Sequence, residues 1–381
     1  MRFIHTADWQ LGMTRRFLDD DAQPRYSAAR RDVVAGLGAL AQRTGAEFVV
    51  VAGDVFDANQ LAPKVISQSL AAMGRIEVPV YLLPGNHDPL DPSSVYTSKQ
   101  FLAERPDNVV VLDRAGIFDL RPGVQIVAAP WRSKHPTTDL AADVLAELPS
   151  DGTARILLAH GAVDVLDPDR DNIAAIRMAA VTAALERSAV HYVALGDKHS
   201  RTEVGDSGRV WYSGSPEVTD YNHREADSGH VLLVDIDLDG PTHPVTVETH
   251  TVGTWRFLTI AADLNNRSDI AALDARLDAL PGKDRTVVQL ALKGTVTVTE
   301  RADLDLCIEK YSRLFAGMDN WERHTELVVM PADEEFDNLG IGGFAADAVD
   351  DLKEKACSDG PDAQTARGAL ALLLRLRKGL E

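Results

Sequence analysis

The chain has 381 residues and a formal net charge of −19, with 45% hydrophobic and 25% charged residues. This balance is typical of a soluble globular protein with enough material for two or three domains. No apolar run reaches the roughly 18 residues that a membrane-spanning helix needs, and no signal-peptide pattern precedes the strand-like start, so we expect no membrane association. Only two cysteines occur, far apart, which excludes a disulfide scaffold or a zinc finger and favours a reducing cytoplasm.

The charge also bears on possible partners. With 58 acidic and 39 basic residues, the chain does not resemble a protein that binds nucleic acid through a broad basic face. The ordinary interpretation of such an excess is an acidic surface that keeps the protein in solution. A nucleic-acid function would therefore need a local explanation for how DNA approaches the protein.

The first 255 residues alternate short, β-branched apolar runs with helical stretches. The predicted strands are Arg2–His5, Phe48–Ala52, Val80–Leu83, Val109–Leu112, Val124–Ala128, Ile156–Ala159, Tyr192–Leu195, Val210–Tyr212, Val231–Ile236 and Val245–Val252. The predicted helices are Ser27–Thr44, Lys64–Arg75, Leu140–Glu147 and Ile173–Glu186. This alternation favours an α/β layer fold. The strands from Val210 onward have no helices between them, so part of the sheet is expected to be antiparallel.

Beyond Trp255 the pattern changes to that of a small α+β domain. The predicted strands there are Trp255–Ala261 and Thr286–Leu292, and the predicted helix is Asp269–Ala279. The mixed pattern continues through Thr295–Thr299, Asp303–Phe315 and Glu326–Met330. Two further helical segments follow an acidic stretch and Gly340–Gly343, at Ala345–Ala356 and Ala363–Lys378. We therefore divide the chain into residues 1–255, 256–335 and 336–381.

Five short polar segments stand directly after apolar strands. They are Asp8-Trp9-Gln10, Gly53-Asp54-Val55-Phe56-Asp57, Gly85-Asn86-His87-Asp88, His160-Gly161 and Gly196-Asp197-Lys198-His199. The carboxyl ends of strands in an α/β sheet are where ligands bind, and the glycines permit tight turns and close backbone approach. The donors are carboxylates, amides and imidazoles, with no thiolate. Such a set suits Mn²⁺, Fe or Mg²⁺ better than a structural zinc.

The number of donors is sufficient for two metal ions. One carboxylate can bridge two ions about 3.5–4 Å apart, and Asp54 is the predicted bridge because it follows the most continuously apolar strand. The two predicted ligand sets are Asp8, Gln10, Asp54 and His199 for one ion, and Asp54, Asn86, His160 and Asp197 for the other. His87 stays uncommitted beside them, with Asp88 or Asp57 available to orient it. A histidine there would stabilise the reacting phosphorus and protonate the leaving oxygen, so His87 and Asp88 are the candidate catalytic pair.

This ordered set of segments resembles the calcineurin-like metallophosphoesterases. Within them, Tyr212-Ser213-Gly214-Ser215-Pro216 and Trp255-Arg256-Phe257 are similar to segments of the SbcD-type DNA-repair nucleases. The resemblance implies a metallophosphoesterase β-sandwich flanked by helices over residues 1–255, a smaller α+β cap domain over 256–335, and C-terminal helices. It also implies a Mn²⁺-dependent nuclease, acting as a 3′→5′ exonuclease on double-stranded DNA ends and an endonuclease on single strands.

The same resemblance implies partners. An SbcC-type coiled-coil ATPase would bind the C-terminal helices within residues 336–381, the nuclease would act on DNA in repair and recombination, and a homodimer is expected. The residues alone leave two alternatives open for these helices. They either pack on the chain's own core or dock on a helical partner.

Two positions depart from the family pattern. The family usually has histidine where Gln10 and Asp197 stand in this chain. With Asp8 and Asp54, Asp197 raises the number of carboxylate ligands to three, and we expect a site shifted toward Mn²⁺ or Mg²⁺. The alternative is that Lys198 or Arg201 neutralises Asp197, so that one metal site is weak and catalysis is reduced.

Basic residues near these segments are candidates for contacts with the DNA backbone. They are Arg15, Arg16, Arg132, Lys134, Lys198 and Arg201. His5, inside the first strand, is expected to be a core residue. Two alternatives to a nuclease remain open, namely a small-molecule phosphodiesterase and a scaffold subunit with a degraded metal site. For a nuclease, the global acidity predicts DNA binding that is local, metal-dependent and weak without a partner.

Overall fold

The computed structural model describes residues 1–239, 243–330, 343–358, 360 and 362–378. The chain divides into two compact units, the first formed by residues 1–16 and 23–255 and the second by residues 17–22 and 256–381. Among the described residues, no helix is long and apolar enough to cross a membrane.

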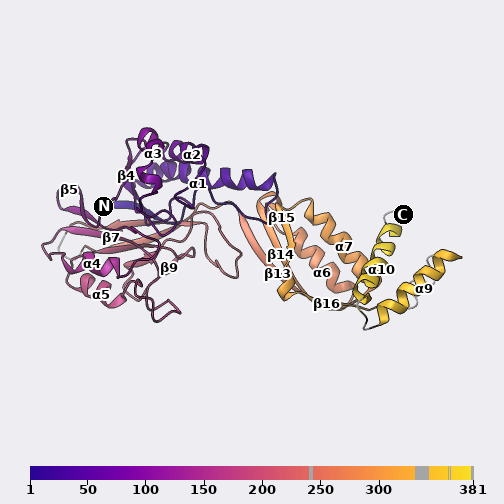
Figure 1. Ribbon diagram of the computed structural model, residues 1–381. Coiled ribbons are helices and arrows are strands. Elements are labelled where there is room, and N and C mark those ends of the chain that lie inside the picture. The colour runs from indigo at the N-terminus through magenta and orange to yellow at the C-terminus, as the bar shows by residue number, and fades with distance from the viewer. Residues whose placement is uncertain (240–242, 331–342, 359, 361, 379–381) are drawn as a thin grey trace. The chain divides into compact units, whose positions relative to one another are not determined.

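The first unit contains two six-stranded sheets (Figure 1). The first sheet has the order β12 (Val245–Thr251), β11 (His230–Ile236), β1 (Arg2–Thr6), β2 (Phe48–Val51), β3 (Val80–Leu82), β4 (Val109–Val111). The second has the order β5 (Gly116–Arg121), β6 (Val124–Ala129), β7 (Ala154–His160), β8 (Tyr192–Gly196), β10 (Val210–Tyr212), β9 (Thr202–Glu203). Strands β1 to β4 pair in parallel, whereas β11 pairs antiparallel with both β1 and β12. The expected antiparallel part of the sheet is therefore confirmed.

Helices cover the outer face of each sheet (Figure 1). The first sheet packs against α1 (Ala22–Thr44), α2 (Pro63–Met73) and α3 (Lys99–Glu104), with the 3₁₀ helix η1 (Val95–Thr97) beside α3. The second sheet packs against α4 (Leu140–Ala146) and α5 (Met178–Glu186). The inner faces of the two sheets share a third apolar cluster. The layers are therefore helix, sheet, sheet, helix, which confirms the predicted β-sandwich flanked by helices.

The alternation of side chains along the strands explains why these runs are continuously apolar. In β2, Phe48 and Val50 face the second sheet, whereas Val49 and Val51 face the helices. In β7, Ile156 likewise lies in the cluster between the sheets. Because both faces of these strands are covered, every position in β2 is apolar. Polar side chains are therefore concentrated at the strand ends.

The second unit mixes helices with strands around a long central strand. Its elements are β13 (Arg256–Leu264), α6 (Arg267–Asp278), η2 (Lys283–Arg285), β14 (Thr286–Thr297), α7 (Val298–Ser312), β15 (Gly317–Asn320), η3 (Glu322–His324) and β16 (Glu326–Met330). Strand β14 pairs in parallel with β13, β15 and β16, and α6 and α7 pack on this sheet. The segment Thr295–Thr299 is divided between two elements, because β14 ends at Thr297, where a capping box with Glu300 starts α7.

Two further helices, α9 (Phe344–Cys357) and α10 (Ala363–Lys378), complete the second unit. They share one apolar cluster with α7, formed by Val298, Ala302, Val349, Ala356, Ala366 and Leu370. The described apolar face of these helices thus packs on the chain's own core, which is the first of the two alternatives. The predicted boundary at 335/336, the acidic stretch before it and most of Gly340–Gly343 lie outside the described residues.

Candidate metal centre

The seven predicted metal ligands come from loops or ends of five parallel strands. Asp8 and Gln10 follow β1, Asp54 follows β2 and Asn86 follows β3, while His160 ends β7 and Asp197 and His199 follow β8. Backbone contacts join these loops, because the Asp8 N–H donates to the Gly53 carbonyl at 3.0 Å and the Gln10 N–H to the Asp54 carbonyl at 2.8 Å. The Asp197 N–H, from the second sheet, donates to the Asp8 carboxylate of the first at 3.1 Å, so the two sheets contribute to one site.

His160 lies at the centre of the second predicted ligand set. Its Nε2 is 3.4 Å from Asp54 Oδ1, 2.7 Å from Asn86 Oδ1 and 3.9 Å from Asp197 Oδ1. Asp8, Asp54 and His160 are all buried, and one ligand atom from each lies within 4.8 Å of the others. The structure thus brings together the four residues predicted for this ion and adds Asp8 beside them.

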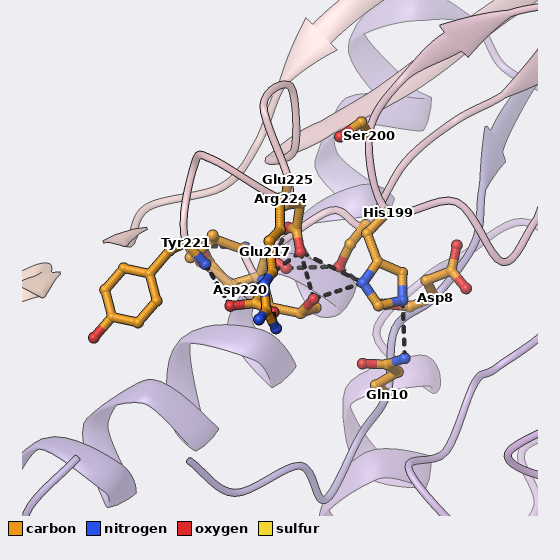
Figure 2. A network of polar contacts seen from close by, with 12 residues as sticks. Asp8, Gln10, His199, Ser200, Glu217, Asp220, Tyr221, Arg224 and Glu225 are labelled. Atoms are coloured by element: carbon orange, nitrogen blue, oxygen red, sulfur yellow. Dashed lines mark hydrogen bonds and ion pairs between the residues drawn. The ribbon is translucent and has the colours of Figure 1, made fainter. Parts of the chain in front are cut away.

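The first predicted ligand set meets around His199, as Figure 2 shows for Asp8, Gln10 and His199. Gln10 Nε2 is 3.1 Å from His199 Nε2, and the Asp8 carboxylate accepts the backbone N–H of Asp197 at 3.1 Å. The carboxamide oxygen of Gln10 is buried and has no hydrogen-bond partner among the described residues. A buried oxygen without a donor is unfavourable, whereas a cation would satisfy it. This oxygen fits the role of a metal ligand.

Left-handed backbone conformations are concentrated in these loops. Six non-glycine residues in the described part of the chain have a positive φ, and four of them are predicted ligands: Asp8 (53°), Gln10 (40°), Asp54 (52°) and Asp197 (101°). Non-glycine residues rarely adopt this conformation, and it is stored mainly at functional sites. The fold therefore holds these four residues in strained backbone conformations that direct their side chains toward the site.

Three glycines are required by the closeness of the ligands. A Cβ on Gly85 would lie 2.2 Å from Asp54 Oδ1, and one on Gly53 would lie 2.1 Å from His160 Nδ1. A Cβ on Gly196 would lie 2.0 Å from the Ala52 carbonyl oxygen. The glycines next to the polar motif residues thus make room for the ligand side chains, as the sequence predicts.

The tautomer of His160 follows from its hydrogen bonds. Its Nδ1 lies 2.8 Å from the Ala52 carbonyl oxygen, which only accepts, so Nδ1 carries the proton and Nε2 faces the site. Burial lowers the pKa of His160, but the charges of Asp54, Asp8 and Asp197 outweigh this effect and raise the pKa to about 9. The carboxylates therefore create a strongly negative environment around this ring.

The carboxylates themselves are crowded. Burial raises the pKa of Asp8 to about 7, with opposing effects from His199 and His160 and a further increase from Asp54. Burial also raises the pKa of Asp197. Ionised carboxylates at such short range repel one another unless a cation lies between them. The donor set and its charge therefore fit divalent metal ions, whereas their number and identity stay predictions.

His87 is placed beside the ligands without being one of them. Its backbone N–H donates to Asp54 Oδ1 at 2.9 Å, and its Nδ1 donates to the Asp57 carbonyl at 2.8 Å. Its Nε2 lies 3.9 Å from Asp54 Oδ2, and the side chain is 40% exposed. Nε2 can therefore approach a bound substrate.

Asp88 has a different role from the one expected. It is buried and accepts hydrogen bonds from the Gly85 N–H (2.8 Å), the Phe56 N–H (2.9 Å) and the Tyr96 hydroxyl (2.6 Å). Both carboxylate oxygens are thus used to brace the loop that carries Asn86 and His87. Of the two residues expected to orient His87, Asp57 contacts the ring, through its backbone carbonyl, and the expectation for Asp88 is corrected.

Among the predicted DNA contacts, Arg201 is engaged elsewhere. Its Nε donates to Asp227 Oδ2 at 2.8 Å and its Nη1 to Thr249 Oγ1 at 2.6 Å. The alternative in which Arg201 neutralises Asp197 therefore finds no support. Lys198 is exposed and forms no hydrogen bond or ion pair with any described residue.

The other candidate cations remain available to different degrees. Arg16 and Lys134 are exposed. Arg132 is also exposed, and its Nη2 donates to the Asp113 carbonyl at 3.1 Å. Arg15 is half-buried, and its Nε is buried without a hydrogen-bond partner among the described residues. Contacts between these side chains and DNA stay predictions.

Further residues outside the predicted ligand set support the site. The buried guanidinium of Arg30 donates to the carbonyl oxygens of Trp9 (2.5 Å) and Asp8 (3.4 Å), which holds the first ligand loop. Ser215 Oγ also donates to the Asp8 carbonyl at 3.1 Å, and a Cβ on Gly214 would lie 2.8 Å from the His199 carbonyl oxygen. The Ser-Gly-Ser motif signals this second role, whereas nothing in the helical pattern distinguishes Arg30.

The chain is similar to several known proteins. A family model described as calcineurin-like phosphoesterase matches residues 1–224. The chain is similar to the D subunit of nuclease SbcCD from Rhodobacter capsulatus, with 28% identity over 368 residues, covering 84% of this chain and 87% of that protein. It is also similar to the D subunit of nuclease SbcCD from Bacillus subtilis, with 35% identity over 92 residues, covering 23% and 22%. Among solved structures, TT1561 of Thermus thermophilus has 14% identity and a TM-score of 0.40, covering 66% of this chain and 98% of that one.

Proposed function

Because the chain belongs to the calcineurin-like phosphoesterase family, we propose that it is a nuclease that hydrolyses phosphodiester bonds in DNA with two divalent cations. The observation that carries the proposal is the convergence of seven oxygen and imidazole donors from five strand ends around Asp54 and His160. The names of the two curated relatives, both nuclease subunits, support DNA as the substrate class.

The proposed ligands divide as predicted, with Asp54 shared between the two sets. Divalent cations held there supply positive charge to the scissile phosphate and to the attacking water. Mn²⁺ is our first choice because the donors are mainly oxygen, with Mg²⁺ and Fe as the alternatives. The buried oxygen of Gln10 supports its place in this set despite the departure from histidine.

His87 is the proposed general acid. Its Nδ1–H is held by the Asp57 carbonyl, so the ring keeps a fixed orientation and Nε2 stays free of other described hydrogen bonds. In the protonated form, Nε2 would donate its proton to the leaving oxygen of the cleaved ester. Asp88 contributes indirectly, since it braces the loop through Gly85 and Phe56.

The finer parts of the proposal concern substrate and partners. We extend it to 3′→5′ exonuclease action on double-stranded ends, endonuclease action on single strands, a homodimer, and work with an SbcC-type ATPase in DNA repair and recombination. The exposed side chains of Arg16, Lys134 and Lys198 would contact phosphates. The helices within residues 336–381 would bind the ATPase through surfaces other than the cluster that they share with α7.

The test combines several substrates with matched variants. The full-length protein is incubated with Mn²⁺ and linear duplex, hairpin or single-stranded DNA, or with a small aryl phosphodiester. We expect DNA cleavage that Asp54→Asn abolishes and that His87→Gln lowers by about 10²–10⁴-fold, the usual contribution of a general acid. Asp206→Asn, which changes an exposed carboxylate outside the ligand loops, should leave the rate unchanged.

Two outcomes would contradict the proposal. Cleavage of the small ester without cleavage of any DNA would indicate a small-molecule phosphodiesterase. No cleavage of any substrate, even with an SbcC-type ATPase and ATP present, would indicate a scaffold subunit with a degraded site.

A further inference from the structure

The ring of His199 is held on both of its nitrogen atoms, as Figure 2 shows. Its Nε2 lies 3.1 Å from the Gln10 side-chain nitrogen. Its Nδ1 lies 2.7 Å from the Thr219 hydroxyl and 3.4 Å from Glu225 Oε2. The contact at Nε2 joins two predicted ligands of one ion. The contacts at Nδ1 join His199 to Thr219 and Glu225, which belong to no motif identified in the sequence.

Glu225 is a buried carboxylate that collects donors from one short turn. Its Oε1 accepts the Thr219 N–H at 2.9 Å, and its Oε2 accepts the Asp220 N–H at 3.0 Å. The Thr219 hydroxyl is also hydrogen-bonded to Oε2. Each oxygen of this buried side chain thus accepts a backbone N–H, so both oxygens act as acceptors toward the turn.

These contacts determine the direction of the hydrogen bonds that link Glu225, Thr219, His199 and Gln10. Because both Glu225 oxygens act as acceptors, the Thr219 hydroxyl donates to Oε2. The Thr219 oxygen must then accept from His199, so Nδ1 of His199 carries the proton. The lone pair of His199 therefore lies on Nε2 and is directed to the Gln10 amide N–H.

We infer that Thr219 and Glu225 are positioning residues that hold His199 as the Nδ1–H tautomer, with the Nε2 lone pair presented to a divalent cation. The inference rests on the proposed function, since His199 belongs to the first proposed ligand set. Such outer contacts orient a ligating ring, and their loss typically lowers metal affinity by about 10–100-fold. The backbone of the Asp220–Glu225 turn helps to place Glu225, because the Glu225 N–H donates to the Tyr221 carbonyl at 3.0 Å.

The first experiment needs no variant that alters the turn. Protein labelled with ¹⁵N at histidine is prepared without metal, and long-range ¹H–¹⁵N correlation spectra report which nitrogen of each ring carries the proton. The His199 signals are assigned by their loss in His199→Asn. The expected result is the Nδ1–H tautomer. A His199 ring protonated only on Nε2 would overturn the inference.

The second experiment measures metal affinity directly. Mn²⁺ is titrated into the metal-free full-length chain, and free Mn²⁺ is followed by electron paramagnetic resonance. Two classes of site are expected in the wild type. Thr219→Val, which removes the hydroxyl at nearly constant size, and Glu225→Gln should each weaken one class by about 10–100-fold and leave the other unchanged. Thr219→Ser keeps the hydroxyl and should restore the wild-type affinities.

Thr44→Val is the matched control for loss of a hydroxyl. Thr44 lies at the end of α1, where its Oγ1 donates to the Leu40 carbonyl at 2.8 Å, and its substitution should change neither class. Unchanged affinities in folded Thr219→Val, or equal weakening of both classes, would overturn the inference while the proposed function stands. A wild-type chain that binds no Mn²⁺ at all would overturn both.

Discussion

At the scale of single residues, a buried histidine next to the first ligand loop shows how the fold treats titratable groups. His5 in β1 is fully buried, its Nδ1 accepts from the Tyr192 hydroxyl at 2.9 Å, and its Nε2 donates to the Leu195 carbonyl at 3.2 Å. The neutral ring is therefore fully hydrogen-bonded, and the expectation that His5 is a core residue is confirmed. Burial lowers its pKa to about 3, although the bond to Leu195 opposes this.

This pKa predicts a loss of stability in acid. The folded-state pKa of His5 lies below its unfolded value of about 6.5, so its contribution is complete above pH 6.5 and is lost as the pH falls toward 3. The slope from this single group approaches about 1.4 kcal/mol per pH unit. Urea unfolding of metal-free protein between pH 7 and pH 4.5 should show a shallower pH dependence for His5→Asn than for the wild type.

The control for this measurement is an exposed histidine. His135→Asn should keep the wild-type pH dependence, because the His135 side chain lies at the surface. If His5→Asn and the wild type lost stability in parallel, the folded-state pKa of His5 would not lie far below its unfolded value.

The residues of the site differ in how readily a sequence reveals them. Asp54 and His160 are visible because each is a polar residue that directly follows a buried apolar run. Thr219 and Glu225 lie in a polar turn where such residues are common, and only the packing of this turn on His199 gives them a role. The bracing role of Asp88 was equally hidden, since its partner Phe56 lies 32 residues away.

At the scale of elements, two glycines two residues apart in α1 experience different surroundings. Gly36 is exposed, and an added Cβ would have no atom within 4 Å. Gly38 is buried, and an added Cβ would lie 2.7 Å from the Arg75 carbonyl oxygen. The first glycine is therefore only a weak point of the helix, whereas the second permits close contact with the turn after α2.

Alanine substitutions should separate these two roles. Gly36→Ala should raise the free energy of unfolding by about 0.5–1 kcal/mol, because alanine has the better helix propensity. Gly38→Ala should lower it by about 1–3 kcal/mol, the usual effect of overpacking. Chemical denaturation of both variants beside the wild type measures the difference. Stabilisation by both substitutions would show that the backbone near Arg75 yields easily.

Elements were predicted best where a repeating apolar pattern defines them. The segment Glu326–Met330 of the mixed pattern forms β16 with the same bounds. By contrast, β5 was not predicted, because Gly116–Arg121 is a half-exposed edge strand without a continuous apolar run. Helix α1 was predicted to begin at Ser27 but begins at Ala22. At this start, the Asp19 carboxylate accepts the Ala22 N–H at 2.6 Å. Such caps depend on single polar contacts that periodicity does not detect.

At the scale of the whole molecule, the net charge of −19 limits how DNA can bind. Since Arg201 is paired with Asp227, five of the six predicted cations remain for phosphate contacts. Each neutralised phosphate adds about −0.9 to the slope of log affinity against log salt concentration, so the slope should be no steeper than about −4.5. Binding should also depend on the divalent ions, because they offset the carboxylates of the site.

Fluorescence anisotropy with labelled duplex DNA tests both statements. Ca²⁺ replaces Mn²⁺ to prevent cleavage, and the affinity is measured across a series of salt concentrations. We expect at least a roughly 10-fold loss of affinity when chelator is added at physiological salt. Tight DNA binding in the presence of chelator would instead indicate a broad basic face, as would a slope of log affinity against log salt concentration of about −10.

The origin of the ligands in both sheets has a mechanical consequence. Asp8, Asp54 and Asn86 extend from the first sheet and His160 and Asp197 from the second, while the cluster between the sheets is apolar. Bound ions would act as cross-links that must break before the two layers can slide apart. Metal loading should therefore slow unfolding more than it speeds folding, and the metal-free protein should be cut more readily by proteases at the strand ends.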